Sequence, residues 1–349
     1  MRRLIYIFII GLLLCSYTWA DGSRYASKSL LSEGKWVKIR VDKTGIYKLS
    51  YADLKNMGFS DPSKVSVHGY GGWPLDEDFS KEYIDDVPST PVWRGSDYLL
   101  FYGKGPVKWE YDSSSQTFVH TNNPYSLYGY YFVTDATPTN DMTSVAQASG
   151  ATNRITTYDD YLVHEQELVS LAKSGRELYG EDFSGATPRT LSTFSSIPGI
   201  TNEDAKVTMS FVSKVTSGTG VASLSINQSN VLDVSIRSNR EEYVKALEGV
   251  STAVWKGEKS EKNSVVVSYN SASHNNVRLN YVRLHFKRTL QPYGAYTFFR
   301  SIASIGNVSR FVVQGANANT LVFDVTDAQR VRLCLLYTSP SPRDGATSR

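Results

Sequence analysis

Cysteine is almost absent from this chain of 349 residues, which has two, Cys15 and Cys334, one near each end. The stretch between them therefore holds no disulfide framework, no thiolate metal site and no cysteine nucleophile. A strong excess of one charge is also lacking, because the formal net charge is only +3. Bulk charge thus gives no reason to expect nucleic acid or an anionic membrane as a partner. With 41% hydrophobic residues, the chain is not a disordered tail either.

Long apolar runs are limited to one, Leu4–Cys15, which follows the cationic start Met1-Arg2-Arg3. This run is shorter than the about 20 residues that a membrane-spanning helix needs. Thr18-Trp19-Ala20 then offers a small residue at a cleavage position. The sequence therefore predicts a secretory signal peptide over residues 1–20 and an exported protein. A lipoprotein signal is the minor alternative, because the residue before the cysteine is not small.

The opposite end departs from the pattern of the rest. Residues 334–344 read Cys-Leu-Leu-Tyr-Thr-Ser-Pro-Ser-Pro-Arg-Asp, which one reading frame of a transposase-type sequencing adapter encodes. We expect residues 334–349 to be a translated adapter rather than native protein, and the native chain to continue beyond Leu333. Without residues 1–20 and 334–349, basic and acidic residues are equal in number and no cysteine remains.

Short strands with alternating apolar and polar side chains dominate the remaining sequence. Residues 37–41 alternate apolar with basic side chains and, with residues 46–49, predict a β-hairpin. Ser50 followed by Asp53 has the spacing of a capping box, which predicts a short helix that ends at Gly58.

The same alternation returns in the second half of the chain. Residues 207–211 and 281–287 are predicted strands whose apolar side chains face the core, and the basic side chains of 281–287 face outward. Residues 161–171 fit either a helix or a long strand. Residues 136–152 are poor in large apolar side chains and predict a linker or a wide surface loop.

These patterns predict a mostly β fold class with one or two short helices. Two antiparallel domains of β-sandwich or jelly-roll type are expected. The N-terminal β-rich domain is placed at residues 21–155 and the second β-sandwich domain at residues 156–333.

Candidate chemistry is sparse. No two of the histidines stand at the spacing of metal ligands, so a structural or surface role is expected for each; they are His68, His120, His164, His274 and His285.

Three further patterns are weak. Ser170 and Lys173 match S-x-x-K, but the partner motifs of serine acyl-enzymes are absent, which indicates a chance match. The acidic runs Asp76-Glu77-Asp78 and Asp85-Asp86 lack the alternating ligand spacing of a calcium loop, so a solvated loop is expected. The glycine-rich segment Gly69–Gly72 lacks a strand–helix frame for phosphate. The sequence therefore assigns no catalytic, cofactor-binding or metal-binding residue and predicts no cofactor.

Aromatic side chains are the remaining feature with a functional alternative. Trp73, Trp93, Trp109 and the tyrosines between residues 125 and 131 have the chemistry to stack on sugars or on a partner chain. Packing within the core or between domains is the favoured interpretation.

Several ordered motifs resemble the N-terminal region of gingipain-family cysteine peptidases, and most resemble the sortase of the type IX secretion system. The matching segments are Gly34–Leu49, Tyr51–Gly58, Val67–Gly72, Asp97–Pro106, Thr121–Tyr125, Asn280–Val282 and Phe323–Asp327. In that family such a region precedes a caspase-like peptidase domain with a His–Cys dyad. The resemblance ends before any peptidase domain, so it transfers no catalytic residue to this chain.

The resemblance implies the N-terminal, non-catalytic region of an exported peptidase that processes C-terminal signals of secretion cargo. Its expected partners are the peptidase domain of the same parent chain, cargo and outer-membrane components. The expected location is the periplasm, outer membrane or cell surface. A carbohydrate-binding or partner-binding β-sandwich protein of the cell envelope is the alternative. A propeptide-like inhibitor of the peptidase domain is a third hypothesis.

Overall fold

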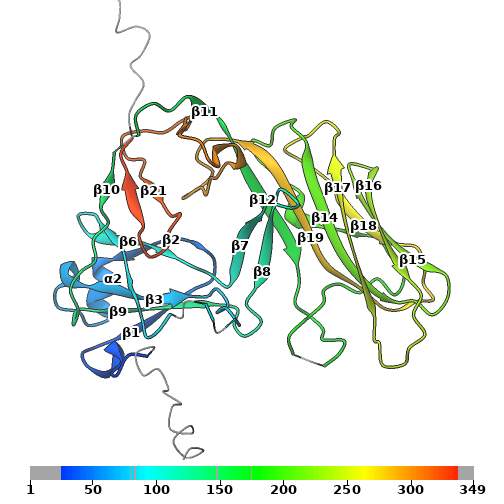
Figure 1. Cartoon of the computed structure of the whole chain (residues 1–349), viewed down its shortest axis with the longest axis horizontal. Coiled ribbons are helices and arrows are strands. Elements are labelled where there is room, and N and C mark those ends of the chain that lie inside the picture. Colours follow the sequence, from blue (N-terminus) through cyan, green and yellow to red (C-terminus); the bar gives the residue numbers. More distant parts are fainter. Residues whose placement is uncertain (1–24, 79, 82–83, 147, 174, 337–349) are drawn as a thin grey trace, which may run out of the picture. The chain divides into compact units, whose positions relative to one another are not determined.

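The computed structural model describes residues 25–78, 80–81, 84–146, 148–173 and 175–336 (Figure 1). The signal peptide predicted at residues 1–20 lies outside the described residues. So does most of the expected adapter segment, of which only residues 334–336 are described. No helix in the described ranges has the length and hydropathy needed to cross a bilayer.

Two compact units are formed, and they interleave along the chain. The first unit contains the chain up to Pro106, Tyr128–Thr143 and Asp324–Leu333; the second contains Val107–Leu127, Ser144–Phe323 and the remainder. The sequence predicts a single boundary near residue 155, and this division into folding domains stays a prediction. Three short strands occur where the chain passes between units: β10 (Ser144–Val145), β21 (Val322–Asp324) and β22 (Arg332–Cys334).

The first unit is built from two antiparallel sheets with strand orders β1-β9-β3-β4 and β2-β6-β5. Its strands are β1 (Val37–Val41), β2 (Gly45–Ser50), β3 (Ser66–Gly71), β4 (Ser89–Thr90), β5 (Val92–Arg94), β6 (Tyr98–Gly103) and β9 (Gly129–Thr134). Both sheets contribute to one apolar core, which includes Val67 and Val133 from one sheet and Leu99 and Phe101 from the other. Tyr131 crosses this core and contacts the Phe101 ring edge-on at 5.2 Å.

The predicted short helix is present as α2 (Tyr51–Asn56), and the Ser50 hydroxyl accepts a hydrogen bond from the Asp53 N–H as a capping box requires. The chain leaves the helix through Gly58, whose φ of +88° lies in the left-handed region that favours glycine. Two 3-10 turns, η1 (Leu30–Ser32) and η2 (Pro62–Lys64), complete the helical part of this unit.

The predicted hairpin of residues 37–41 and 46–49 is wrong, although both strands exist. β1 pairs with β9, and β2 pairs with β6 in the other sheet. Both strands bury apolar side chains in the same core, so their alternation is satisfied when the chain crosses from one sheet to the other.

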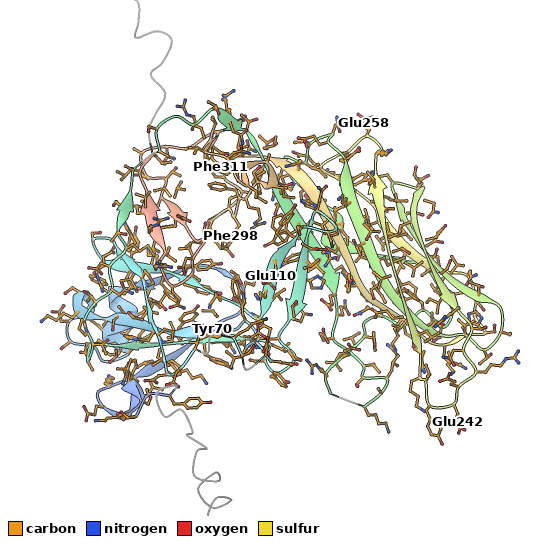
Figure 2. All side chains as sticks on the ribbon, viewed as in Figure 1. Tyr70, Glu110, Glu242, Glu258, Phe298 and Phe311 are labelled. Carbon is orange, nitrogen blue, oxygen red and sulfur yellow. The ribbon has the colours of Figure 1, made fainter. Side chains whose placement is uncertain are left out.

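The second unit is a larger sandwich of the sheets β12-β19-β14-β17 and β13-β18-β15-β16. Its sandwich strands are β12 (Thr157–Glu165), β13 (Arg189–Thr190), β14 (Ala205–Lys214), β15 (Thr219–Ile226), β16 (Ser229–Arg237), β17 (Leu247–Trp255), β18 (Val265–Tyr269) and β19 (Asn275–Thr289). Its other elements are β7 (Val107–Asp112), β8 (Thr117–Asn122), β11 (Asn153–Ile155), β20 (Ser309–Phe311), η3 (Ser192–Phe194) and η4 (Ile302–Ser304). Loops close the sandwich at both ends of β17, where Figure 2 labels Glu242 and Glu258.

The two sandwich sheets face one another across an apolar core that contains Met209, Phe211, Leu224, Val267 and many similar residues. The mostly β, antiparallel sandwich fold with a short helix is thus confirmed. Residues 161–171, which the sequence left open, begin as the end of strand β12 and continue as a loop, not as a helix.

Candidate functional site

The hairpin formed by β7 and β8 carries aromatic and titratable side chains that contact one sheet of the same unit. We define the hairpin cluster as Trp109, Phe118 and His120 of the hairpin together with Tyr161, Glu165 and Arg283 of the sheet β12-β19-β14-β17. In the hairpin register Trp109 lies opposite His120. Because side chains of directly opposed residues share one face, both reach the same side of the hairpin.

Aromatic stacking forms the apolar half of the hairpin cluster. The rings of Trp109 and Tyr161 are stacked, with their centroids 3.7 Å apart and an angle of 16° between the planes. The ring centroid of Phe118 lies 5.6 Å from that of Tyr161 and 5.6 Å from that of His285, which it contacts edge-on. The Arg300 guanidinium lies 4.3 Å from the centre of the Tyr161 ring. These contacts hold the hairpin on the sheet and desolvate the polar groups beside them.

His120 joins two charged groups in the polar half of the cluster. Its Nε2 lies 2.8 Å from Glu165 Oε2, and its Nδ1 lies 3.2 Å from Arg283 Nη1. Because arginine only donates, Nδ1 is the acceptor and the Nε2–H donates to Glu165. The His120 side chain is only 4% exposed and both of its ring nitrogens are bonded, so it is a buried link between Glu165 and Arg283. It holds β8 against β12 and β19.

Burial shifts the titration of the groups around this row. Burial lowers the pKa of Arg283 below its usual value, while the phenol of Tyr281 and the carboxylates of Asp112 and Glu165 act in the opposite direction. Burial also raises the pKa of Glu167, although a hydrogen bond from Asn122 opposes this. The arginine remains the positive partner of the cluster at neutral pH.

Asp159 forms a second charged cluster on the same face of the sheet. Its carboxylate accepts from Lys287 Nζ at 2.8 Å, from His285 Nε2 at 3.2 Å and from the Ile302 N–H at 2.7 Å. Burial alone raises the pKa of Asp159, but the hydrogen bonds from His285 and Lys287 outweigh it and hold the pKa below its usual value. The bonds fix the η4 segment to β12.

His164 is placed between a hydroxyl and a carboxylate. Its Nδ1 is 2.9 Å from Thr193 Oγ1 and its Nε2 is 2.6 Å from Glu181 Oε1. Burial raises the pKa of Glu181, but the bond from His164 leaves it below its usual value. A hydroxyl, an imidazole and a carboxylate in a row also occur in nucleophilic catalysis. A cavity of about 290 Å³ beside Trp255 and another of about 380 Å³ beside Trp36 are lined by other residues. The two bonds of His164 link β12, η3 and the segment before β13.

The two remaining histidines are also held by side-chain contacts. His68 Nε2 lies 2.8 Å from the Thr137 hydroxyl, and Trp36 contacts the ring edge-on. Burial lowers the pKa of His68, and this favours its neutral form. His274 Nδ1 lies 2.7 Å from the Tyr269 hydroxyl. Among the described residues no group of three or more His, Cys, Asp and Glu side chains has the geometry to hold a metal ion.

The S-x-x-K match and the acidic runs do not come together in one site. Ser170 and Lys173 lie in the loop after β12, and no hydrogen bond between them is found there. Asp76 pairs with Lys81 at 2.6 Å. Asp86 accepts bonds from the Ser29 hydroxyl and the Leu30 N–H, both at 2.6 Å, so this acidic residue anchors the segment that precedes β1.

The tryptophans considered for sugar stacking are all at least half-buried. Trp109 is covered by Tyr161, Trp93 contacts Tyr98 at 5.7 Å, and Trp73 lies 5.0 Å from Lys104 Nζ. Of the tyrosine-rich segment, Tyr125 is 81% exposed. Packing, the interpretation favoured from the sequence, therefore accounts for the three tryptophans.

Sequence reasoning missed the hairpin cluster and the Asp159 cluster. A signal for them exists, because the outward positions of residues 159–165 and 281–287 are rich in charged and aromatic side chains. Such side chains can face water, and where another element covers them they need charged or hydrogen-bonding partners from that element. In the sequence, His120 of the covering hairpin is 163 residues away from Arg283. The local pattern around Arg283 therefore does not identify the hairpin as its partner.

Two units built from packed β-sheets, and a charged sheet face that a hairpin contacts, define the class of this protein, a mostly β, antiparallel multi-sheet region. Part of the dimeric latent PorU of Porphyromonas gingivalis has the same fold: its solved structure matches 91% of this chain with a TM-score of 0.82 and 31% sequence identity. The chain is thus close to PorU, as the sequence resemblance predicted. It spans 30% of the length of that PorU chain. No protein-family model and no curated protein matches the sequence.

Other solved structures share far less with this chain. A family 35 carbohydrate-binding module from Clostridium thermocellum covers 37% of the chain at 10% identity, with a TM-score of 0.23 and 95% of its own length matched. The β-porphyranase BpGH86A of glycoside hydrolase family 86, from Bacteroides plebeius, covers 73% of the chain and 35% of its own at 10% identity, with a TM-score of 0.24. Likenesses at this level carry no argument about function.

Proposed function

We propose that this chain is the N-terminal, non-catalytic region of an exported PorU-type cysteine peptidase of the gingipain family. The observation that supports the proposal is the match to PorU over 91% of the chain at 31% identity. The parent protein would act as the sortase that removes C-terminal signals from type IX secretion cargo. The chain spans 30% of the PorU chain, so the peptidase activity is assigned to sequence outside the matched region.

Cysteine usage supports a non-catalytic role for residues 21–333. This stretch contains no cysteine and therefore no thiolate nucleophile. The histidines in it are bonded to Glu165, Glu181, Asp159 and to hydroxyl groups, which gives them a role in packing. We assign to the region the positioning of the peptidase domain and the docking of cargo or outer-membrane components at the cell surface or in the periplasm.

A chimera tests the proposed function directly. In cells that lack their own PorU, the matched region of PorU is replaced by this chain, and processing of secretion cargo is followed by the loss of its C-terminal signal. We expect processing to be restored. As a matched control, the same chimera with Trp109→Ala and Phe211→Ala, which remove contacts inside the second unit, should restore less. A stable, exported chimera that processes no cargo contradicts the proposal.

A second assay isolates the claim that the region is non-catalytic. The purified chain is incubated with a peptide that carries a cargo cleavage site, with and without a thiol-blocking reagent. No cleavage is expected. Cleavage that the reagent abolishes would assign catalysis to this chain and overturn the proposal.

The carbohydrate-binding alternative receives no support from its own motivating residues. Trp73, Trp93 and Trp109 were the basis for it, and each contacts another side chain within its own unit. No tryptophan in the described ranges is exposed. The PorU-type function is therefore the one that we retain.

A further inference from the structure

Strand β1 is an edge strand of the first unit. It pairs with β9 on one side, and the strand order β1-β9-β3-β4 places no described strand on its other side (Figure 1). Its five residues pair with β9 without a register shift. In an antiparallel edge strand, alternate residues direct their backbone N–H and C=O groups away from the sheet. β1 therefore presents a regular row of backbone donors and acceptors.

β1 has only one of the common devices that block an edge strand, the charged side chains of Lys38 and Arg40. The strand has no proline and no bulge, whereas β4, at the opposite edge of the sheet, has only two residues and lies between Pro88 and Pro91. Lys38 Nζ is held 3.9 Å from the centre of the Tyr130 ring, and the Arg40 guanidinium 4.3 Å from that of Tyr128. Both cations thus lie over aromatic rings on one face of the sheet.

Asp42 is the acidic residue nearest in sequence to these two cations. Among the described residues neither Lys38 nor Arg40 forms an ion pair, although both are exposed. The acidic residue that follows the strand, Asp42, accepts a bond from the Tyr47 hydroxyl at 3.0 Å, and Lys43 adds a further cation at the strand end. The segment from residue 38 to residue 43 therefore carries three cations and one carboxylate, a net positive charge.

We propose that the free edge of β1 binds an extended acidic peptide segment by strand addition. The backbone of the segment pairs with β1, and two carboxylates at alternate positions meet Lys38 and Arg40. The spacing fits, because residues i and i+2 of a strand lie on one face about 7 Å apart. The pairing supplies affinity through backbone hydrogen bonds, and the charges select acidic segments. This inference does not depend on the proposed function.

The test uses the chain and a capped eight-residue peptide that alternates glutamate and threonine, with the glutamine analogue as its matched control. We expect saturable binding of the glutamate peptide, about tenfold weaker binding of the analogue, and slower hydrogen exchange within residues 37–41 when the peptide is bound. The last measurement needs no variant, so it decides the location of binding even where a substitution harms folding.

Two variants separate the edge from charge in general. Lys38→Glu combined with Arg40→Glu should weaken binding by at least about tenfold. Lys48→Glu is the matched control, because Lys48 is also exposed and lies 4.1 Å above a tyrosine ring, that of Tyr98, in the other sheet; it should leave binding almost unchanged. Absence of saturable binding, equal loss in both variants, or equal binding of heparin without protection of residues 37–41 would overturn the proposal.

Discussion

On one face of the sheet β12-β19-β14-β17, the side chains of β14 and β19 are aliphatic or aromatic and pack against the second sheet of the sandwich. On the other face of the sheet, β12 and β19 carry mostly charged and aromatic side chains, and the hairpin β7–β8 contacts several of them. Residues as close in sequence as Val282 and Arg283 are both buried, at 1% and 8% exposure. Side chains are thus buried on both faces, by apolar packing on one and by contacts with the hairpin on the other.

The difference lies in what each face requires of its neighbours. An apolar side chain such as Leu284 gains stability wherever close packing is available. A charged side chain such as Asp159 gains it only when specific donors reach it, because an unpaired buried charge is strongly destabilising. The inner face therefore tolerates conservative changes of shape, whereas the outer face depends on individual partners.

The largest expected loss of stability comes from a substitution on the inner face. Phe211 is fully buried, with its ring stacked 5.4 Å from that of Tyr269 and edge-on to Phe183. Phe211→Ala should lower the free energy of unfolding by about 3–5 kcal/mol, since it leaves a cavity. Urea denaturation followed by circular dichroism measures this. Tyr243→Ala, at a side chain that is 90% exposed, is the control and should change it by about 0.5 kcal/mol or less. Equal effects of the two would contradict a packed inner face.

Asp159 should give the next largest effect, on the outer face. Asp159→Ala leaves Lys287 and His285 without their acceptor and should cost about 3 kcal/mol of unfolding free energy at pH 7. The folded-state pKa of Asp159 is lowered, so its contribution is present above the unfolded-state pKa of about 3.9 and is lost as the pH falls below it.

Denaturation as a function of pH checks the assignment of Asp159. The natural chain should lose stability between about pH 4 and pH 2, and Asp159→Asn, which keeps the shape but not the charge, should lose less over the same interval. An unchanged pH dependence in Asp159→Asn would show that the carboxylate has no role in the outer face.

The comparison of the two faces also shows which features of the fold the sequence predicts and which it does not. The alternation in residues 281–287 correctly predicts that Val282, Leu284 and Phe286 face the core and that Arg283 and His285 face away from it. It does not predict that the outward residues are buried. Alternation identifies the faces of a strand, but the element that covers a face is fixed by tertiary contacts distant in sequence.

The same limit explains the wrong hairpin at residues 37–41 and 46–49. Alternation shows that both strands have one apolar face, and the turn between them is short. Both facts hold when the strands pair side by side and when they lie in opposite sheets of one sandwich. By contrast, the capping of α2 is a local interaction between Ser50 and Asp53, and the sequence predicts it correctly.

Trp109 should give an intermediate effect, because it attaches the hairpin to the outer face but is only half-buried. Trp109→Ala removes the stack on Tyr161 and should cost about 2 kcal/mol. Hydrogen exchange should accelerate mainly within residues 107–122. Trp109→Phe keeps an aromatic ring and should recover part of the loss. Slower or unchanged exchange in the hairpin would show that the stack does not hold it in place.

The smallest change in unfolding free energy is expected for a substitution on the part of the outer face that the hairpin does not cover. Val250 of β17 lies opposite Ser210 and is 53% exposed. Val250→Thr keeps a β-branched side chain in contact with water, so the unfolding free energy should change by about 0.5 kcal/mol or less. The matched change on the inner face, Val207→Thr, puts a hydroxyl among apolar side chains at a position that is 1% exposed and should cost about 1–3 kcal/mol. Paired denaturation curves measure both, and equal losses would mean that the uncovered part of the outer face is also packed against a partner.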